Sequence, residues 1–574
     1  MPRLRVGPLV RAMSSESVVI WTEWTHPCEA ILQATPSDQS NKQAASPQTV
    51  CSRTMTIGNR HYTLLRLDGL QPSSWYDYDV ACKTVGEEQA IPAATGALKH
   101  CFRTLDPPEA GNALRLAYGS CRKPSTLEPD ALNAFSSWLM DRFNERETAW
   151  PHLLLLIGDQ IYGDNFTGRQ GRRKGTSSLT INAQSEPPGR TGAQTFAEFA
   201  SLYEQAWAGN DGIRQVLAVI PTCMIFDDHE ITNSWNTSPD WRASALRHGL
   251  EPMLVDGLVA YWVYQGWGNP GAQNEADNAL AVLMQEAAQR GEDALERLRA
   301  TLRKAVNEEI ALRWHYDIPT MPPIFVMDVR ADRPAILRDT DDADAPTRIM
   351  SRHQMSELQE WIKNHDTSTV LLVSSVPVLL PPLIGLAEYA MSIRPFHRTL
   401  FRPVGHLLTR IQQRATRHMS FDHWPVFATT WRELVNILSH RRHDIVVLSG
   451  DVHFSYAAEA HRGIFHSKKH ASLFQLVASP FANALDSRDA RLVRTQARVK
   501  RAIYGGLHIR MLRLTGAKAT VARDVLMQNT VALVTFEPQL SSSNKGRYSM
   551  RQVYLGIIDG KLEEVAHHSD SFAQ

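Results

Sequence analysis

Residues 152–164 read HLLLLIGDQIYGD, a short apolar run that ends at Gly158 and continues directly into Asp159. An apolar run of this kind is typical of a strand buried on both faces of a sheet. In open α/β sheets the ligand crevice lies outside the carboxyl ends of the strands. The stretch therefore predicts a central strand that delivers a carboxylate to the edge where such a sheet binds its ligand.

The same pattern recurs along the chain: CMIF precedes Asp227 and Asp228, IFVM precedes Asp328, and DIVVLSG precedes Asp451. Nearby carboxylates repel one another unless cations neutralise them, so several such strands in one sheet predict a metal cluster. The alternative for any single aspartate is a turn former or a helix N-cap. Repetition in the strings GDQIYGD, DDHE and GDVH favours the metal interpretation.

Two histidines lie beside these aspartates. His453 follows Asp451 by two residues, so in an extended segment both face one side and offer an oxygen and an imidazole ligand. A strand-end histidine bonded to the backbone is the alternative. His229 lies between Asp228 and Glu230, where an imidazole could donate a proton or a hydrogen bond to a developing charge. Its alternative is a buried, hydrogen-bonded histidine.

Cys121 and Tyr162 lie near two of these strand ends. Each has a simpler interpretation, as a small core residue and as a packing aromatic. If both line the same edge, thiolate and phenolate favour a trivalent or strongly Lewis-acidic ion over magnesium.

The chain divides into two regions by pattern. Residues 3–103 contain short extended runs such as SVVIWTEW and HYTLLRLDGL and predict a small β-sandwich. After Pro108, apolar runs alternate with amphipathic helices, which predicts an α/β domain with a central sheet. Three stretches look like insertions, at 165–195, at 243–316, which is helical in pattern, and at 387–419. The last strand-like runs, NTVALVTFE and RQVYLGII, have no predicted place.

Composition excludes several classes of protein. The 574 residues carry 61 basic and 60 acidic side chains, a formal net charge of +1, which argues against a dedicated nucleic-acid binder. Six cysteines without CxxC pairs, and an amino terminus without a secretory pattern, predict reduced thiols and a cytoplasmic location. The uncharged stretch 367–387 contains three prolines, so we expect a buried strand and a Pro-rich loop, not a membrane span.

Six motifs in order resemble the PhoD-like alkaline phosphatases, a branch of the calcineurin-like metallophosphoesterases: YGSCR, GDQIYGD, DDHEITN, VMDVRADR, DHW and LSGDVHFS. The resemblance runs from about residue 114 to 483. It implies an α/β sandwich of central sheets flanked by helices over residues 113–574. The front segment, residues 1–106, resembles the fibronectin-III-like sandwich that precedes the catalytic domain in that family.

The resemblance also implies site residues. The matching metal ligands are Cys121, Asp159, Tyr162, Asp228, Asp451 and His453. His229 matches the catalytic histidine, Asp159 is expected to bridge ions, and Asn233 is a weaker candidate for substrate binding. Such sites are associated with iron and calcium, whereas other metallophosphoesterases use manganese or zinc.

The implied mechanism is attack on phosphorus by a metal-bound hydroxide. Arg330 is the preferred cationic contact for the phosphate, because its guanidinium matches two phosphate oxygens. A structural ion pair is the alternative for Arg330, and Arg122 is a second choice.

The expected substrates are small-molecule, lipid or nucleotide phosphate esters, as monoesters or diesters, with no stable nucleic-acid partner and no transmembrane segment. Rival hypotheses are a nuclease or phospholipase with the same metal cluster, and a binding protein on a hydrolase fold that has lost turnover. The sequence predicts no oligomeric state.

Overall fold

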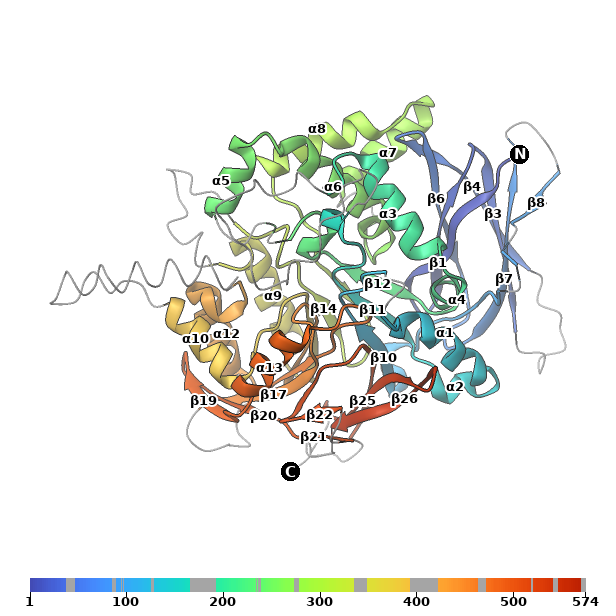
Figure 1. The fold of residues 1–574 in the computed structure, drawn as a ribbon. Helices are drawn as coiled ribbons and strands as arrows, with labels where there is room; N and C mark the ends of the chain where they lie inside the picture. Colours follow the sequence, from blue (N-terminus) through green and yellow to red (C-terminus); the bar gives the residue numbers. More distant parts are fainter. Residues whose placement is uncertain are drawn as a thin grey trace.

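The computed structural model describes most of the chain (Figure 1). The described residues are 1–37, 47–84, 89–93, 95–96, 98–124, 128–165, 192–233, 235, 239–272, 278–334, 348–392, 422–462, 471–517, 520–539 and 546–568. The predicted insertion at 165–195 and the one at 387–419 therefore lie largely outside the described residues.

Two antiparallel sheets form the N-terminal region. One has the order β1 (Leu4–Met13), β2 (Ser17–Trp24), β6 (Arg60–Asp68), β5 (Met55–Ile57). The other has the order β4 (Gln48–Arg53), β3 (Glu29–Pro36), β7 (Trp75–Lys83), β8 (Ile91–Pro92), and β9 (Cys101–Arg103) also pairs with β7. Val10 and Ile20 from the first sheet share one buried cluster with Leu32 and Tyr78 from the second. The predicted β-rich region is therefore present.

Two larger sheets form the centre of the molecule. The seven-stranded sheet has the order β12 (Thr222–Ile225), β11 (Leu153–Ile157), β10 (Leu114–Gly119), β24 (Thr530–Pro538), β25 (Tyr548–Ile558), β26 (Lys561–His568), β21 (Leu514–Gly516). The eight-stranded sheet has the order β13 (Tyr316–Ile318), β14 (Ile324–Val326), β15 (Val370–Ser374), β16 (Ile445–Ser449), β18 (Leu473–Val477), β17 (Tyr456–His461), β20 (Leu507–Met511), β19 (Arg501–Tyr504). Strands β10 to β12 are mutually parallel, as are β14, β15, β16 and β18. A short hairpin joins β22 (Val521–Ala522) to β23 (Val525–Leu526).

The two central sheets face each other, and helices cover their outer sides. Leu155 and Tyr118 of one sheet share a buried cluster with Val373 and Leu448 of the other. On the side of the first sheet lie α1 (Ala131–Asp141), α2 (Arg146–Ala149), α3 (Phe196–Ala208), α4 (Asp211–Val219) and α6 (Glu251–Tyr264). Farther from this sheet lie α5 (Pro239–Arg247), α7 (Ala279–Arg290) and α8 (Leu295–Val306); α8 packs against α6, and α7 packs against α8 and β5. Beside the second lie α9 (Arg352–Asn364), α10 (Pro382–Ser392), α12 (Ala428–His440) and α13 (Ser487–Gln496).

The helices form where the sequence places apolar residues at helical spacing. In α1 the buried residues include Leu132, Phe135 and Leu139, and Asp130 caps the first turn by accepting from the backbone N–H of Asn133. The mixed α/β architecture with several sheets, as predicted, is thus confirmed.

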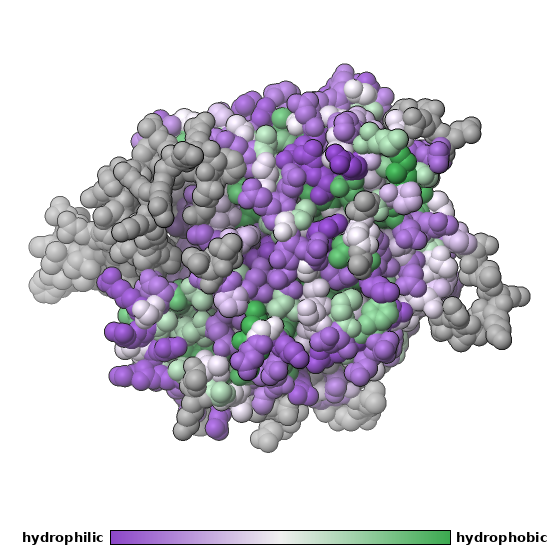
Figure 2. Space-filling model, turned by 45° about the vertical axis from the view of Figure 1, so that its right-hand side comes forward, coloured by the Kyte–Doolittle hydropathy of each residue, from purple (hydrophilic) through white to green (hydrophobic). Residues whose placement is uncertain are grey.

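The stretch 367–387 contains β15, a Pro-rich turn and the start of α10. Within the described residues, no helix has the length and apolar character needed to span a bilayer. On the face drawn in Figure 2, hydrophobic side chains lie in small separate groups among hydrophilic ones.

Candidate metal centre

The candidate metal centre lies where the carboxyl ends of parallel strands from both central sheets meet. Hydrogen bonds join the two edges: the backbone N–H of Asp451, after β16, donates to Ser120 Oγ, after β10, at 3.0 Å. The backbone at Gly450 lies so close to Ser120 that a Cβ on residue 450 would lie 2.2 Å from Ser120 Oγ. Glycine is therefore needed in GDVH for the two sheet edges to come together.

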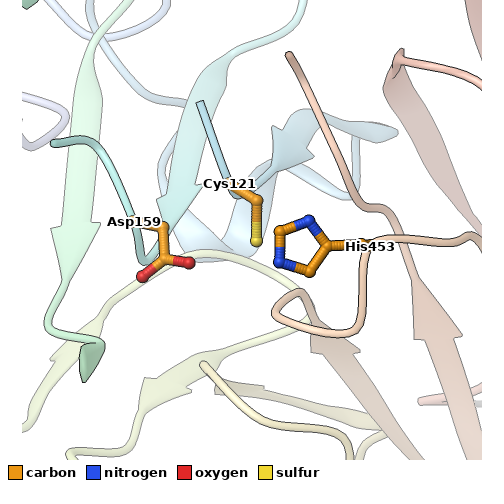
Figure 3. A group of neighbouring side chains, drawn as sticks. All are labelled: Cys121, Asp159 and His453. Carbon is orange, nitrogen blue, oxygen red and sulfur yellow. The ribbon is translucent and has the colours of Figure 1, made fainter. Parts of the chain in front are cut away.

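Cys121, Asp159 and His453 form the first group of potential ligands (Figure 3). Their ligand atoms all lie within 4.8 Å of one another, and the three side chains point toward a common point. Each residue has a positive φ, of 55° at Cys121, 55° at Asp159 and 59° at His453. Such φ values are uncommon for residues with a Cβ and are often found where a functional site imposes strain.

Two further groups continue the cluster. Asp159, Asp228 and His229 form one, and Asp227, Asp228 and Asp451 form the other, each within the same 4.8 Å limit. Asp159 and Asp228 each belong to two of the three groups, so the groups are contiguous.

Tyr162 completes the set of residues predicted as ligands. Its hydroxyl lies 3.4 Å from Asp159 Oδ2 and accepts a hydrogen bond of 2.7 Å from Asn483 Nδ2. The structure thus brings together all six residues that the resemblance implied as ligands, from strand ends up to 332 positions apart in the chain.

Burial makes this cluster costly without cations. Asp159 is fully buried, and burial, with the nearby charges of Asp227 and Asp228, raises its pKa well above the ordinary value. Burial and the charge of Asp159 likewise raise the pKa of Cys121 and of Tyr162. Bound cations would favour the deprotonated forms of these groups. The donor set of thiol, phenol, imidazole and carboxylates therefore fits metal ions.

His229 is oriented by a residue that the sequence reasoning did not single out. Its Nδ1 lies 3.1 Å from Asp164 Oδ1, and its ring lies 4.3 Å from that of Tyr162, centroid to centroid. Burial opposes the charged imidazole, but the charges of Asp164 and Asp228 outweigh it and raise the pKa of His229. Asp164 is the last residue of GDQIYGD. Because it does not directly follow a strand, its position in the sequence did not indicate that it orients His229.

Glu230 is a second residue that sequence reasoning did not assign. It is 1% exposed, and its carboxylate accepts hydrogen bonds from the backbone N–H groups of Asp159, Gln160 and Asp227. The last residue of DDHE therefore joins the loop after β11 to the loop after β12. In the sequence, only the position of Glu230 in the DDHE motif indicated that it belongs to the site.

Arg330 is placed differently from the expectation of a phosphate contact. It is 1% exposed; its Nε donates to Asp227 Oδ1 at 2.5 Å, its Nη1 donates to Asp422, and its Nη2 lies 3.6 Å from Asp451 Oδ1. The alternative of a structural ion pair fits this geometry, because the guanidinium is enclosed by carboxylates.

Other candidates contribute in different ways. Arg122 is 3% exposed and paired with Asp130, so it too is buried. Asn233 is half-buried in the turn after η4 (Asp228–Glu230), and its role stays a prediction. Asp328 accepts from the backbone N–H groups of Arg330 and Ala331, which is the turn-forming alternative.

Two residues outside the predicted set also adjoin the centre. The Nζ of Lys123, which is half-buried, lies 5.4 Å from the centroid of the Tyr162 ring. His423, in the DHW string, has its Nε2 3.2 Å from Asp451 Oδ2.

The chain matches known proteins in sequence and in fold. Residues 133–506 match a family model described as PhoD-like phosphatase, and residues 1–101 match a domain of unknown function, DUF7800. No curated protein matches the chain.

Among solved structures, PhoD shares 12% identity over 98% of this chain and 92% of its own, with a TM-score of 0.50, which shows a common fold. Purple acid phosphatase PPD1 from yellow lupin (Lupinus luteus) seeds shares 8% over 98% of this chain and 73% of its own, with a TM-score of 0.45. The predicted metal-dependent hydrolysis of phosphate esters is confirmed by the family match, which covers more than half of the sequence. The chain belongs to the PhoD-like phosphatase family.

Proposed function

We propose that the contiguous cluster of Cys121, Asp159, Tyr162, Asp228, Asp451 and His453 holds the metal ions with which this chain hydrolyses phosphate esters. The observation that carries the assignment is the convergence of these side chains on one edge shared by both sheets. Asp159 is the best candidate for a shared ligand because it belongs to two of the three groups.

Iron with calcium is the proposed metal content, with manganese or zinc as alternatives. Thiolate, phenolate and imidazole donors suit a strongly Lewis-acidic ion, whereas the group of three aspartates suits a hard cation. Metal ions of this kind, when bound, polarise phosphoryl oxygens and lower the pKa of water.

His229 is the proposed proton donor or hydrogen-bond donor to the reacting phosphate ester. Since a carboxylate only accepts hydrogen bonds, Asp164 holds the Nδ1–H of His229, and Nε2 is the atom that would serve the substrate. Arg330 is proposed as a positioning residue that balances the charges of Asp227, Asp422 and Asp451.

Lys123 is the proposed cationic contact for the substrate in place of Arg330. It is half-buried, whereas Arg330 and Arg122 are enclosed and paired with carboxylates. Its position over Tyr162 places a positive charge beside the proposed ligands. Asn233 is retained as a weaker candidate for substrate binding.

The substrate class stays open between monoesters and diesters of small molecules, lipids or nucleotides. A nuclease or phospholipase would use the same cluster on polymers or lipid headgroups. Activity compared on a monoester, a diester, single-stranded nucleic acid and phospholipid separates these possibilities.

We also propose how the chain divides into domains and where the protein is located. The two N-terminal sheets, which share one core, support a fibronectin-III-like sandwich over 1–106. The catalytic domain would then span 113–574, with insertions near 165–195, 243–316 and 387–419. A cytoplasmic location is proposed from the sequence alone.

The central test is Asp159→Asn. Loss of one carboxylate charge from a residue in two ligand groups should weaken metal binding and lower hydrolysis by about 100-fold, the upper end of what the loss of an outer hydrogen-bond partner typically costs. Metal content by mass spectrometry and hydrolysis of a monoester and a diester are measured together. Asp317→Asn, on an exposed position of β13, is the control and should match the unaltered protein. Full activity with full metal content in Asp159→Asn would remove the assignment.

A further inference from the structure

A buried glutamate–histidine pair outside the predicted ligand set reaches the metal centre. Glu388 in α10 is 1% exposed, and its Oε1 lies 2.7 Å from Nδ1 of His423. Nε2 of the same ring lies 3.2 Å from Oδ2 of Asp451. The imidazole of His423 therefore spans two carboxylates, one deep in the protein and one among the proposed metal ligands.

The neighbouring residue acts on the same carboxylate through Arg330. Asp422 binds Nη1 of Arg330, and Nη2 of that guanidinium lies 3.6 Å from Oδ1 of Asp451. His423 thus contacts one oxygen of Asp451 directly, and Asp422 binds the arginine that faces the other oxygen. The main chain of Asp451 is held separately by Ser120, at a positive φ of 66°.

The pair also joins two parts of the chain that are distant in sequence. Glu388 lies four residues before the end of α10, and His423 immediately precedes η8 (Trp424–Val426), which packs against α10. The side chain of Trp424 is anchored in turn by its Nε1, which donates to Ser374 Oγ at 3.1 Å, at the end of β15. These contacts hold the His423 imidazole in one position, and a residue that orients a metal ligand needs such support.

We propose that Glu388 and His423 are a positioning pair that orients Asp451 for metal binding and so sets the cation affinity of the centre. Carboxylate ligands are commonly held by outer hydrogen-bond partners, and the loss of one such partner typically lowers metal affinity or activity 10- to 100-fold. The inference rests on the proposed function in one respect, that Asp451 is a metal ligand.

The test is a calorimetric titration of chelator-treated protein with Mn²⁺ or Ca²⁺ alone. His423→Ala should bind the cation about 10- to 100-fold more weakly. Glu388→Gln should weaken binding less, and the double variant should bind no more weakly than His423→Ala, because both changes remove one chain of hydrogen bonds. Saturating metal should restore most of kcat in His423→Ala, with KM within about twofold.

His315→Ala is the matched control. His315 Nε2 lies 2.6 Å from Glu357 Oε2, and its side chain is 11% exposed compared with 13% for His423. It immediately precedes edge strand β13, whereas Asp451 follows the central strand β16. Its loss should leave cation affinity unchanged.

Unchanged affinity in a folded His423→Ala, or in Glu388→Gln if the alanine variant does not fold, would overturn the inference. An equal loss in His315→Ala would also overturn it, since the effect would then be general. If the unaltered protein binds the cation but hydrolyses no phosphate ester, the proposed function fails while the positioning role is still decided by affinity. If it binds no cation, both fail.

Discussion

At the scale of single residues, His229 is surrounded by groups that fix its orientation. Asp164 lies at Nδ1, the Tyr162 ring contacts the imidazole at a tilt of 34°, and the backbone N–H of His229 donates to Asp159 Oδ1 at 3.3 Å. His229→Ala should lower kcat by about 10²- to 10⁴-fold with near-normal metal content, because a proton donor is lost. Asp164→Asn should lower it less. Steady-state kinetics and metal analysis of both variants check these expectations. Loss of metal in His229→Ala would show that His229 is a metal ligand and not a proton donor.

Lys123 is the second single residue whose proposed role can be tested directly. Lys123→Met should raise KM about tenfold, which corresponds to about 1.4 kcal/mol of binding, and leave kcat within about twofold. Lys99→Met is a matched control, since Lys99 also lies over an aromatic ring, that of Phe143, 5.8 Å from its centroid. A KM equal in both variants would show that Lys123 does not meet the substrate.

At the scale of elements, the ends of β10, β11 and β16 decide the site. The residues that follow these strands, Cys121, Asp159 and Asp451, all have positive φ, so each chain turns sharply and aims a donor at the edge where the two sheets meet. Apolar runs followed by carboxylates predicted β11 with Asp159 and β16 with Asp451, whereas Cys121 after β10 was expected as a ligand only from the family resemblance. The left-handed backbone conformations were not predictable, because they arise from contacts between the two sheet edges and not from the conformational preferences of the residues themselves.

The last strand, β26, supplies a pH-dependent contribution to stability. His568 is 2% exposed; its Nδ1 donates to the Arg513 carbonyl at 3.0 Å, and burial lowers its pKa to about 4. The unfolded chain takes up this proton near pH 6.5, so the stability present above pH 6.5 falls as the pH approaches 4. The loss should reach about 2–3 kcal/mol by pH 4.5.

Urea unfolding at pH 7 and pH 4.5 measures this loss. His568→Gln, whose amide can also donate to the carbonyl, should lose less free energy of unfolding over the same interval. An identical pH dependence in both proteins would exclude His568 as its source.

At the scale of the whole molecule, the N-terminal sheets are tied to the catalytic region by Arg11. This residue of β1 is fully buried, and its guanidinium donates to the carbonyls of Thr222, Tyr264 and Gln265 and to the side chain of Asn269. Arg11→Met removes these hydrogen bonds to buried acceptors and should lower the free energy of unfolding by about 3 kcal/mol or more.

Urea unfolding of the full chain measures this difference. Arg66→Met, at an exposed position of β6 in the same sheet, should cost less than about 0.5 kcal/mol. Equal stability of the Arg11 variant and the unaltered protein would show that the two regions are joined by other contacts.

The amino-acid sequence was enough to predict the mixed α/β class, the buried strands, several helices and the chemical types of the proposed ligands. Burial and periodicity are local properties, so apolar runs revealed β11 and β16, and helical spacing revealed α1. The pairing of β24 with β10, about 400 residues away, and the place of Arg330 among carboxylates became visible only in the folded chain. The Glu388–His423 pair emerged in the same way. The partner of a charge or of a strand edge depends on which distant segments pack together, and no local pattern records that.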